Sequence, residues 1–445
     1  MKRFLASVLA VALCTSTFAG CSSGTTAISA TSNSTGAVAA QKPVTLSYIT
    51  WNYSDRTKST DAFIKAVKEK YNITIEMQNV PTDQYTAVLK TKVASSDIPD
   101  LVCLHSMSDD YVADKISFNK DSFVDLSSLS EVKNYSTSVL DAVKEDGKVF
   151  YVPISISALG AMYNKSIFTQ AGITKLPTNL SEFTADLEKI KAKGITPIAA
   201  GQKDSWTSQM IPKIAFSQYI DSKDQTIATK LGTGNMKYAD IATDFTKVLN
   251  VQQDWNKKGY FQENCLGTSI DVACQLVATG KAGMLINGTW EYSAINKANP
   301  DAEIGFFPVP LNNTSTEKIQ LPASAEEGIA INAASKNSDA AKQALNYYLS
   351  AENQALVMAD LNGISTNSQV KSSSKFVQEV QSVLKQSNVN VPAINMGWSD
   401  GLYYPVATSF VFTDQCQALL AGTTTVEKLI SDFDTANAKA LKKSK

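Results

Sequence analysis

Apolar and polar residues alternate with two different periods along the region that begins near residue 44, and each period predicts a type of element. In chain order, the predicted elements are a strand over 44–51, a helix over 61–70, a strand over 72–80, a helix over 82–93 and a strand over 101–104. In the first helix, Phe63, Ile64 and Val67 recur at the spacing of an amphipathic face. The second helix has Thr82 or Asp83 as a possible N-cap. This alternation implies crossover connections, so it predicts an α/β fold with a mostly parallel sheet that binds ligands beyond the carboxyl ends of its strands.

The first part of the chain has a different pattern, with no charged residue between Lys2-Arg3 and Lys42. A basic start, an apolar run from Phe4 to Ala19 and small residues before Cys21 are typical of a secretory signal. The Ala-Gly-Cys ending resembles the bacterial lipoprotein signal, in which cleavage leaves a lipid-carrying cysteine as the new N-terminus. We therefore predict a lipoprotein signal peptide over 1–20 and a Cys21 anchor in the lipid bilayer. The alternative is an ordinary signal peptide with a chance cysteine.

The stretch that follows Cys21 is almost entirely Ser, Thr, Ala, Gly and Asn. Such a composition buries too little apolar surface to offset the entropy of ordering, so residues 21–42 are predicted to be a flexible tether. The remaining chain, about 400 residues, is long enough for two or three domains. The full sequence has 44% hydrophobic and 19% charged residues, which is ordinary for a soluble globular protein, and no stretch after the leader approaches the length of a membrane span. With a net charge of -1 and no basic stripe, nucleic acid is not an expected partner.

Cysteine and histidine usage limits the chemistry. Cys103 lies in an apolar strand-like run and is predicted to be a small core residue. Cys265 and Cys274 could form a small-loop disulfide in an oxidising compartment, but sequence leaves this open. His105 is the only histidine, so a multi-histidine metal site cannot form and a Ser-His or Cys-His nucleophile could be built only there. No metal and no cofactor is expected.

A carboxylate pair could still hydrolyse glycosidic bonds, because that chemistry needs only two acids at the right separation. A secreted glycoside hydrolase is therefore the rival enzyme hypothesis. Its candidate acids are Asp109-Asp110, Glu326-Glu327 and Asp400, although such residues are more often solvated surface or turn positions.

Several motifs in the middle of the chain carry a family resemblance. They are the segment 147–153 (GKVFYVP), the segment 161–173 (AMYNKSIFTQAGI), the segments 280–284 (GKAGM) and 286–290 (INGTW), and the segment 331–335 (INAAS) followed by a predicted helix through Leu349. In this order they resemble the bacterial extracellular solute-binding proteins of the maltose-binding type, family 1, over roughly residues 43 to 440.

The resemblance implies a type II, periplasmic-binding-protein-like α/β fold with two lobes, each a mostly parallel sheet flanked by helices. It implies a first lobe of residues 43–156 and 311–363 and a second lobe of residues 157–310 and 364–445. Hinge crossovers are expected near 155–159, 307–311 and 363–368, where Pro308, Pro310 and Gly363 fit connecting segments. A solute would be held between the lobes as they close.

A neutral sugar offers apolar C–H faces and a rim of hydroxyls, so its receptor needs aromatic plates and hydrogen-bonding carboxylates and amides. The predicted ligand-binding residues, which follow predicted strands or match the family's aromatic positions, are Trp51, Asn52, His105, Asp109, Asp204, Trp206, Trp290, Glu327, Trp398 and Asp400. The resemblance makes Trp290 the strongest candidate for stacking, whereas Trp255 lies within a predicted helix and is expected to be core. Ser157 stands where the maltose-binding pattern has a sugar-contacting Glu, so the identity of the sugar does not transfer.

These patterns predict a lipid-anchored, monomeric receptor on the extracytoplasmic face of the bacterial membrane. It would capture a carbohydrate, most simply an oligosaccharide, and deliver it to the permease of an ATP-driven (ABC) importer. The chain has no phosphate-binding Gly-x-x-x-x-Gly-Lys-Ser/Thr loop, so the nucleotide-binding subunit would be a separate chain. The receptor hypothesis predicts saturable sugar binding without turnover. The glycoside hydrolase hypothesis predicts formation of a cleavage product, and the surface adhesin hypothesis predicts neither result.

Overall fold

The structure, a computed structural model, describes residues 42–51, 53–104, 122–391 and 409–443. The predicted leader, the Cys21 anchor and nearly all of the tether lie outside these ranges. No helix in the described ranges combines the length and apolar character that crossing a membrane requires.

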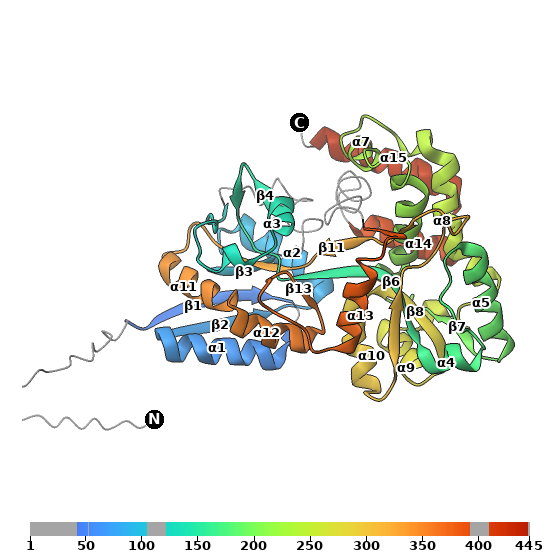
Figure 1. The fold of residues 1–445 in the computed structure, drawn as a ribbon. Coiled ribbons are helices and arrows are strands. Elements are labelled where there is room, and N and C mark those ends of the chain that lie inside the picture. Colours follow the sequence, from blue (N-terminus) through green and yellow to red (C-terminus); the bar gives the residue numbers. More distant parts are fainter. Residues whose placement is uncertain (1–41, 52, 105–121, 392–408, 444–445) are drawn as a thin grey trace, which may run out of the picture. The chain divides into compact units, whose positions relative to one another are not determined.

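The first sheet contains the strands that the sequence pattern predicts near its start. Its strand order is β12-β3-β1-β2 (Figure 1), with the bounds β1 (Val44–Thr50), β2 (Ile73–Asn79), β3 (Leu101–Leu104) and β12 (Gly328–Ile331). β1 pairs in parallel with β2, from Val44 opposite Ile73 to Thr50 opposite Asn79, and in parallel with β3. β12 returns from much later in the chain and pairs antiparallel with β3. The predicted strand, helix, strand, helix, strand order is therefore confirmed.

The helices of this part include the two that the sequence predicts over 61–70 and 82–93. They are α1 (Thr57–Tyr71), α2 (Thr82–Ala94), α3 (Thr137–Val143), α11 (Ser338–Tyr348) and α12 (Ala351–Leu361), with the short elements η1 (Tyr53–Asp55), η3 (Val132–Asn134), β4 (Lys144–Glu145) and β5 (Lys148–Val149). α1 buries Phe63 and Val67, one helical turn apart, and α2 buries Tyr85 and Leu89 at the same spacing. Asn72 caps the C-terminus of α1, and its left-handed backbone (φ 56°) suits asparagine.

The second sheet is organised around the long strand β6. Its strands are β6 (Ser155–Asn164), β7 (Thr196–Ala199), β8 (Ala282–Gly288), β9 (Ile304–Phe307), β11 (Ala323–Ala325) and β13 (Ile364–Ser365), and a separate pair is formed by β10 (Ile319–Gln320) and β14 (Val389–Asn390). β7 and β8 are parallel, but β6 is antiparallel to β8, β9, β11 and β13. The expected mostly parallel character therefore holds for the first sheet, while the second is mixed. Hydrophobic periodicity indicates a strand but does not encode the direction in which it pairs.

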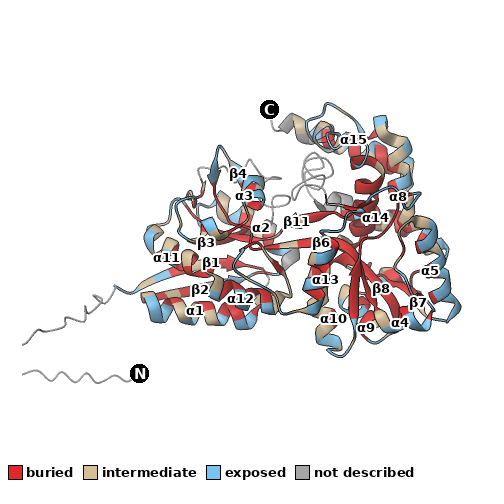
Figure 2. Cartoon of the chain, in the orientation of Figure 1, coloured by how far each residue is buried: buried red, intermediate tan, exposed pale blue. Residues whose placement is uncertain are grey.

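Figure 2 shows the strands of the second sheet buried, with exposed outer surfaces on helices such as α5. The helix α6, by contrast, is buried along its whole length. The α-helices are α4 (Lys165–Gln170), α5 (Leu180–Ala192), α6 (Met210–Phe216), α7 (Ile227–Gly232), α8 (Ala242–Lys257), α9 (Ile270–Ala278), α10 (Tyr292–Ala298), α13 (Lys375–Val383), α14 (Ser409–Leu420) and α15 (Val426–Lys443). The shorter turns are η4 (Ser205–Gln209), the π-helical η5 (Ser217–Asp221), η6 (Tyr238–Ile241), η7 (Cys265–Gly267) and η8 (Thr289–Glu291). Trp255, on α8, is 4% exposed and packs edge-on against Phe183, as the core prediction required.

The first residues of β6 pair with two segments that come from much later in the chain. Ala325 of β11 and Ile364 of β13 both lie opposite Ile156. Of the expected crossovers, 155–159 thus lies in β6 and 363–368 includes β13. The third expected crossover, 307–311, begins at the last residue of β9, where Phe307 lies opposite Ala161 of β6. The division into two lobes at the predicted boundaries stays a prediction.

Asp221, the last residue of the π-helical turn η5, is a buried carboxylic acid. It is 7% exposed, and its Oδ1 lacks a hydrogen-bond partner within the described residues. Burial raises the pKa of this carboxyl to about 7. Because the folded chain then holds a proton that the unfolded chain releases near pH 4, the stability of the fold should fall as pH rises from about 4 through 7.

Asp221→Asn should remove this dependence, because asparagine carries no charge at any of these pH values. Between pH 5 and pH 8 the mutant should gain about 2 kcal/mol of unfolding free energy relative to the wild type. Urea unfolding at four pH values measures this difference, with the exposed Asp254→Asn as the matched control. Parallel pH profiles for Asp221→Asn and the wild type would contradict the assignment.

Candidate functional site

Two predicted tryptophans come together at one edge of the second sheet. β7 and β8 are parallel neighbours, so their carboxyl ends meet at the same edge. Trp206 lies in η4 shortly after β7, and Trp290 lies in η8 directly after β8. Their ring centroids are 6.5 Å apart, and the rings are tilted by 47°. Both indoles are partly exposed, which leaves aromatic surface available at this edge.

The turn that carries Trp290 is fixed by its neighbours. The indole Nε1–H donates to Oε1 of Glu291 at 3.0 Å. The Thr289 hydroxyl accepts a 3.2 Å hydrogen bond from the backbone N–H of Ala158, which attaches the turn to β6. Leu159 lies opposite Gly288 in the ladder, so the first half of β6 reaches the same sheet edge.

Asp204 lies beside Trp206 in the chain, but its carboxylate has a structural contact. Oδ2 accepts a 2.7 Å hydrogen bond from the backbone N–H of Ile270, the first residue of α9. A carboxylate at a helix N-terminus is favoured because it meets free N–H groups and the positive end of the helix dipole. The sequence did predict an acid close to Trp206, and the structure adds that one of its oxygens anchors α9.

Trp51 follows β1, as expected, but it points into the core of the first sheet. The residue is 8% exposed, and its ring packs edge-on against Tyr85, with centroids 4.7 Å apart. The Tyr85 hydroxyl donates to the backbone carbonyl of Cys103 at 2.6 Å. In this structure the aromatic surface of Trp51 is used for packing, so its contribution to ligand binding stays a prediction.

Glu327 is buried beside the carboxyl ends of β1 and β3 and forms an ion pair with Arg56. The guanidinium also contacts the Tyr348 hydroxyl at 3.3 Å and the Thr50 hydroxyl at 3.4 Å. Burial opposes the charge of Arg56, but the Glu327 carboxylate beside it prevails and raises the pKa well above its ordinary value. Burial, with the nearby Glu327, raises the pKa of the Cys103 thiol to about 12.

Arg56 is a buried charged residue beside a predicted ligand contact, and the sequence analysis did not select it. One signal could have found it, because the chain has only two arginines and the other, Arg3, lies in the predicted leader. Arginine is preferred over lysine for buried ion pairs, since its planar guanidinium makes several directed hydrogen bonds. The carboxylate of Glu327, predicted as a ligand contact, is engaged by this partner. Its role toward a ligand remains a prediction.

The described cysteines are free and buried, so Cys265 and Cys274 are not bridged. Cys103 is buried in the core, as predicted. Five other predicted site residues, Asn52, His105, Asp109, Trp398 and Asp400, lie outside the described residues. Within the described ranges, no group of three or more His, Cys, Asp or Glu side chains is placed to hold a metal ion.

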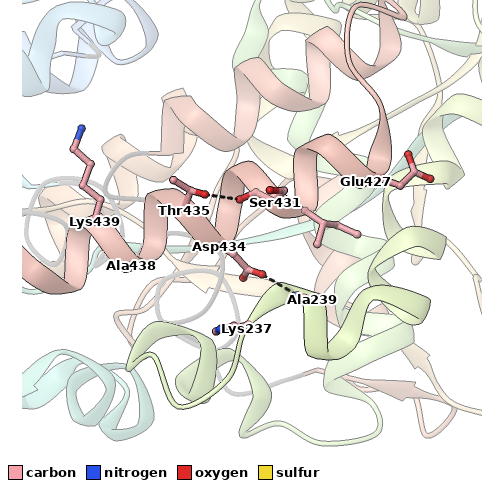
Figure 3. Close-up of a pocket in the computed structure, with 9 residues that line it drawn as sticks. Lys237, Ala239, Glu427, Ser431, Asp434, Thr435, Ala438 and Lys439 are labelled. Carbon is pink, nitrogen blue, oxygen red and sulfur yellow. Dashed lines mark hydrogen bonds between the residues drawn. The ribbon is translucent and has the colours of Figure 1, made fainter.

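A separate hollow of about 800 Å³ lies between η6 and α15, lined by residues that include Lys237, Glu427 and Lys439. Figure 3 shows Asp434 pointing from α15 toward the start of η6. Its carboxylate oxygens accept hydrogen bonds from the backbone N–H groups of Tyr238, at 2.6 Å, and Ala239, at 3.2 Å. The Asp434 contact therefore docks α15 on η6, and the hollow brings together none of the predicted ligand residues.

Comparison with known proteins decides the family. The family model described as bacterial extracellular solute-binding protein matches residues 53–355. The chain belongs to this family. The solute-binding protein described here is 28% identical to the multiple sugar-binding protein of Streptococcus mutans over 278 residues, a match that covers 60% of this chain and 63% of that relative. It is 23% identical to the melibiose/raffinose/stachyose-binding protein MelE of Bacillus subtilis, over 60% of this chain and 62% of MelE. The chain thus spans less than two thirds of the length of these relatives.

Solved structures support the same fold for this solute-binding protein. A chitin oligosaccharide binding protein superposes with a TM-score of 0.76 at 23% identity, covering 90% of this chain and 99% of that one. The solute-binding protein RafE in complex with raffinose gives a TM-score of 0.70 at 23% identity, covering 88% and 99%. The predicted type II, two-lobed α/β fold is therefore confirmed.

Proposed function

We propose that this solute-binding protein captures an oligosaccharide and delivers it to the permease of an ABC importer. The observation that carries the proposal is the pair of partly exposed indoles, Trp206 and Trp290, which meet at the carboxyl edge of β7 and β8. Aromatic faces at this separation suit the apolar C–H faces of adjacent sugar rings. The relatives named for binding raffinose, stachyose or chitin oligosaccharides support the same ligand class.

The proposed capture involves closure of two lobes over the sugar. A ligand that contacts both lobes favours the closed state, because only contacts made better in one state shift the population. On the first lobe, Asn52, His105 and Asp109 are proposed contacts, and Trp398 and Asp400 are proposed contacts from the last part of the chain. The closed form would then be the state that the permease recognises.

The proposed location is the extracytoplasmic face of the cell membrane, with a lipid on Cys21 and a monomeric receptor on a flexible tether. The apolar run from Phe4 to Ala19, followed by Gly20-Cys21, supports this part of the proposal. Mass spectrometry of the membrane-extracted protein should find a lipidated Cys21 at the N-terminus. Recovery of an unmodified protein that retains its first twenty residues would overturn the anchor without affecting the sugar-binding proposal.

The sugar-binding proposal is tested on the chain from residue 22 onward with raffinose, stachyose and chitin oligosaccharides. Calorimetry measures binding, and chromatography of the same mixtures measures cleavage. Saturable binding with intact sugars is the expected result. Cleavage would overturn the receptor in favour of the glycoside hydrolase, and a lack of both would count against sugar binding and favour an adhesin.

A further inference from the structure

Glu291 is the acid that follows the proposed stacking tryptophan, and both of its carboxylate oxygens are engaged. Oε1 accepts the hydrogen bond from the Trp290 indole at 3.0 Å, and Oε2 accepts a 3.4 Å contact from the Cys274 thiol on α9. Glu291 itself is 8% exposed, and Cys274 is 1% exposed. The carboxylate therefore links the turn η8 to a core helix and is not presented to solvent as a ligand contact.

The backbone of Gly288 lies against the six-membered ring of the same indole. A Cβ atom at this position would lie 2.2 Å from two atoms of the Trp290 benzene ring. Only a residue without a side chain allows the ring to lie this close to the backbone. The six-membered ring is therefore held against Gly288, while the pyrrole N–H is held by Glu291.

We infer that Glu291 is a positioning residue that holds the Trp290 indole in its stacking orientation before the sugar arrives. This inference rests on the proposed function, since it assigns Trp290 the role of a sugar plate. An indole that is already ordered costs the complex less entropy than one that must be immobilised by the ligand. Because its N–H is occupied by Glu291, Trp290 offers the sugar a ring face and no hydrogen-bond donor. Cys274 keeps the carboxylate in place from the side of the core.

The first test uses the ligand-free protein and the indole N–H signals in a ¹H–¹⁵N spectrum. The Trp290 signal is assigned by its loss in Trp290→Phe. In Glu291→Ala this signal should shift and its proton should exchange faster with water, because its acceptor is gone. Glu291→Gln keeps an oxygen acceptor without the charge, so the signal should shift while exchange stays slow. The exposed Glu263→Ala should leave it unchanged.

The second test measures sugar affinity with the tightest binder among raffinose, stachyose and chitin oligosaccharides. The dissociation constant should rise about tenfold in Glu291→Ala and stay within about threefold in Glu291→Gln, since the amide oxygen can still accept the indole N–H. If Glu291→Ala does not fold, the Glu291→Gln spectrum still decides, because an unmoved Trp290 signal would overturn the inference. A moved signal with unchanged affinity in Glu291→Ala would also overturn it. Failure of the wild type to bind any of these sugars would instead defeat the proposed function, and the spectra would still report the positioning contact.

Discussion

Replacing Arg56 with methionine is expected to lower the free energy of unfolding by about 3 to 5 kcal/mol, because it leaves a buried carboxylate without its counter-charge. The side chains of Arg56 and Glu327 are 3% and 7% exposed, so solvent cannot compensate for the loss. Methionine fills much of the volume of the arginine stem, which separates the electrostatic effect from a packing defect.

The expected loss is large because Arg56 also connects three elements. Its guanidinium reaches Thr50 at the end of β1, Tyr348 at the end of α11 and the Cys103 sulfur on β3, the last at 3.7 Å. The Glu327 backbone carbonyl accepts a 3.0 Å hydrogen bond from Ile154, just before β6. Removing the pair therefore loosens the attachment of β12 and the start of β6 to the first sheet.

The test is urea unfolding of Arg56→Met, Glu327→Leu and the double mutant. The double mutant should be more stable than either single mutant, because a buried pair replaced by apolar groups leaves no unpaired charge. Lys65→Ala, which breaks an exposed pair with Glu69, is the control and should cost less than about 1 kcal/mol. A loss at Arg56→Met as small as that of the control would contradict the buried-pair assignment.

Local periodicity was enough to predict the first three strands of the first sheet and the two helices between them, but it predicted neither β12 nor how the second sheet pairs. A strand such as β3, buried along all four residues, is apparent from its apolar run between Pro99-Asp100 and the polar stretch that follows. The antiparallel direction of β6 depends on contacts with β8, more than a hundred residues away in sequence. The π-helical turn η5 likewise has no periodic signal of its own, because it continues the buried face of α6.

Strand position and family resemblance selected the candidate site residues, but they did not determine how each side chain packs. Trp206 and Trp290 were selected by the family resemblance, and they lie close together because β7 and β8 are parallel neighbours. Trp51 also follows a strand, yet it turns inward to pack on Tyr85, and strand position alone does not determine that rotation. Glu327 is predicted as a ligand contact from its place beside aromatic or strand-end positions, and no sequence pattern places Arg56 beside it across 271 residues.

Trp290→Ala is expected to raise the dissociation constant for the bound oligosaccharide roughly 100-fold, which corresponds to about 3 kcal/mol. A sugar ring stacked on an indole loses both the buried aromatic area and the stacking contact when the side chain is truncated. Trp206→Ala, in η4, should have a smaller effect. The Trp290 ring is already held in place by Gly288 and Glu291, so it gives up less entropy when the sugar stacks on it.

The matched control is Trp255→Ala, in which a tryptophan is lost from the core of the same sheet. Trp255 is 4% exposed and packs against Phe183, so its loss should lower the melting temperature while leaving the affinity of the folded protein within about threefold. Calorimetric titration well below the melting temperatures measures all three variants. If Trp290→Ala and Trp255→Ala weaken binding equally, Trp290 is a packing residue, and the aromatic edge formed by β7 and β8 is not where the sugar stacks.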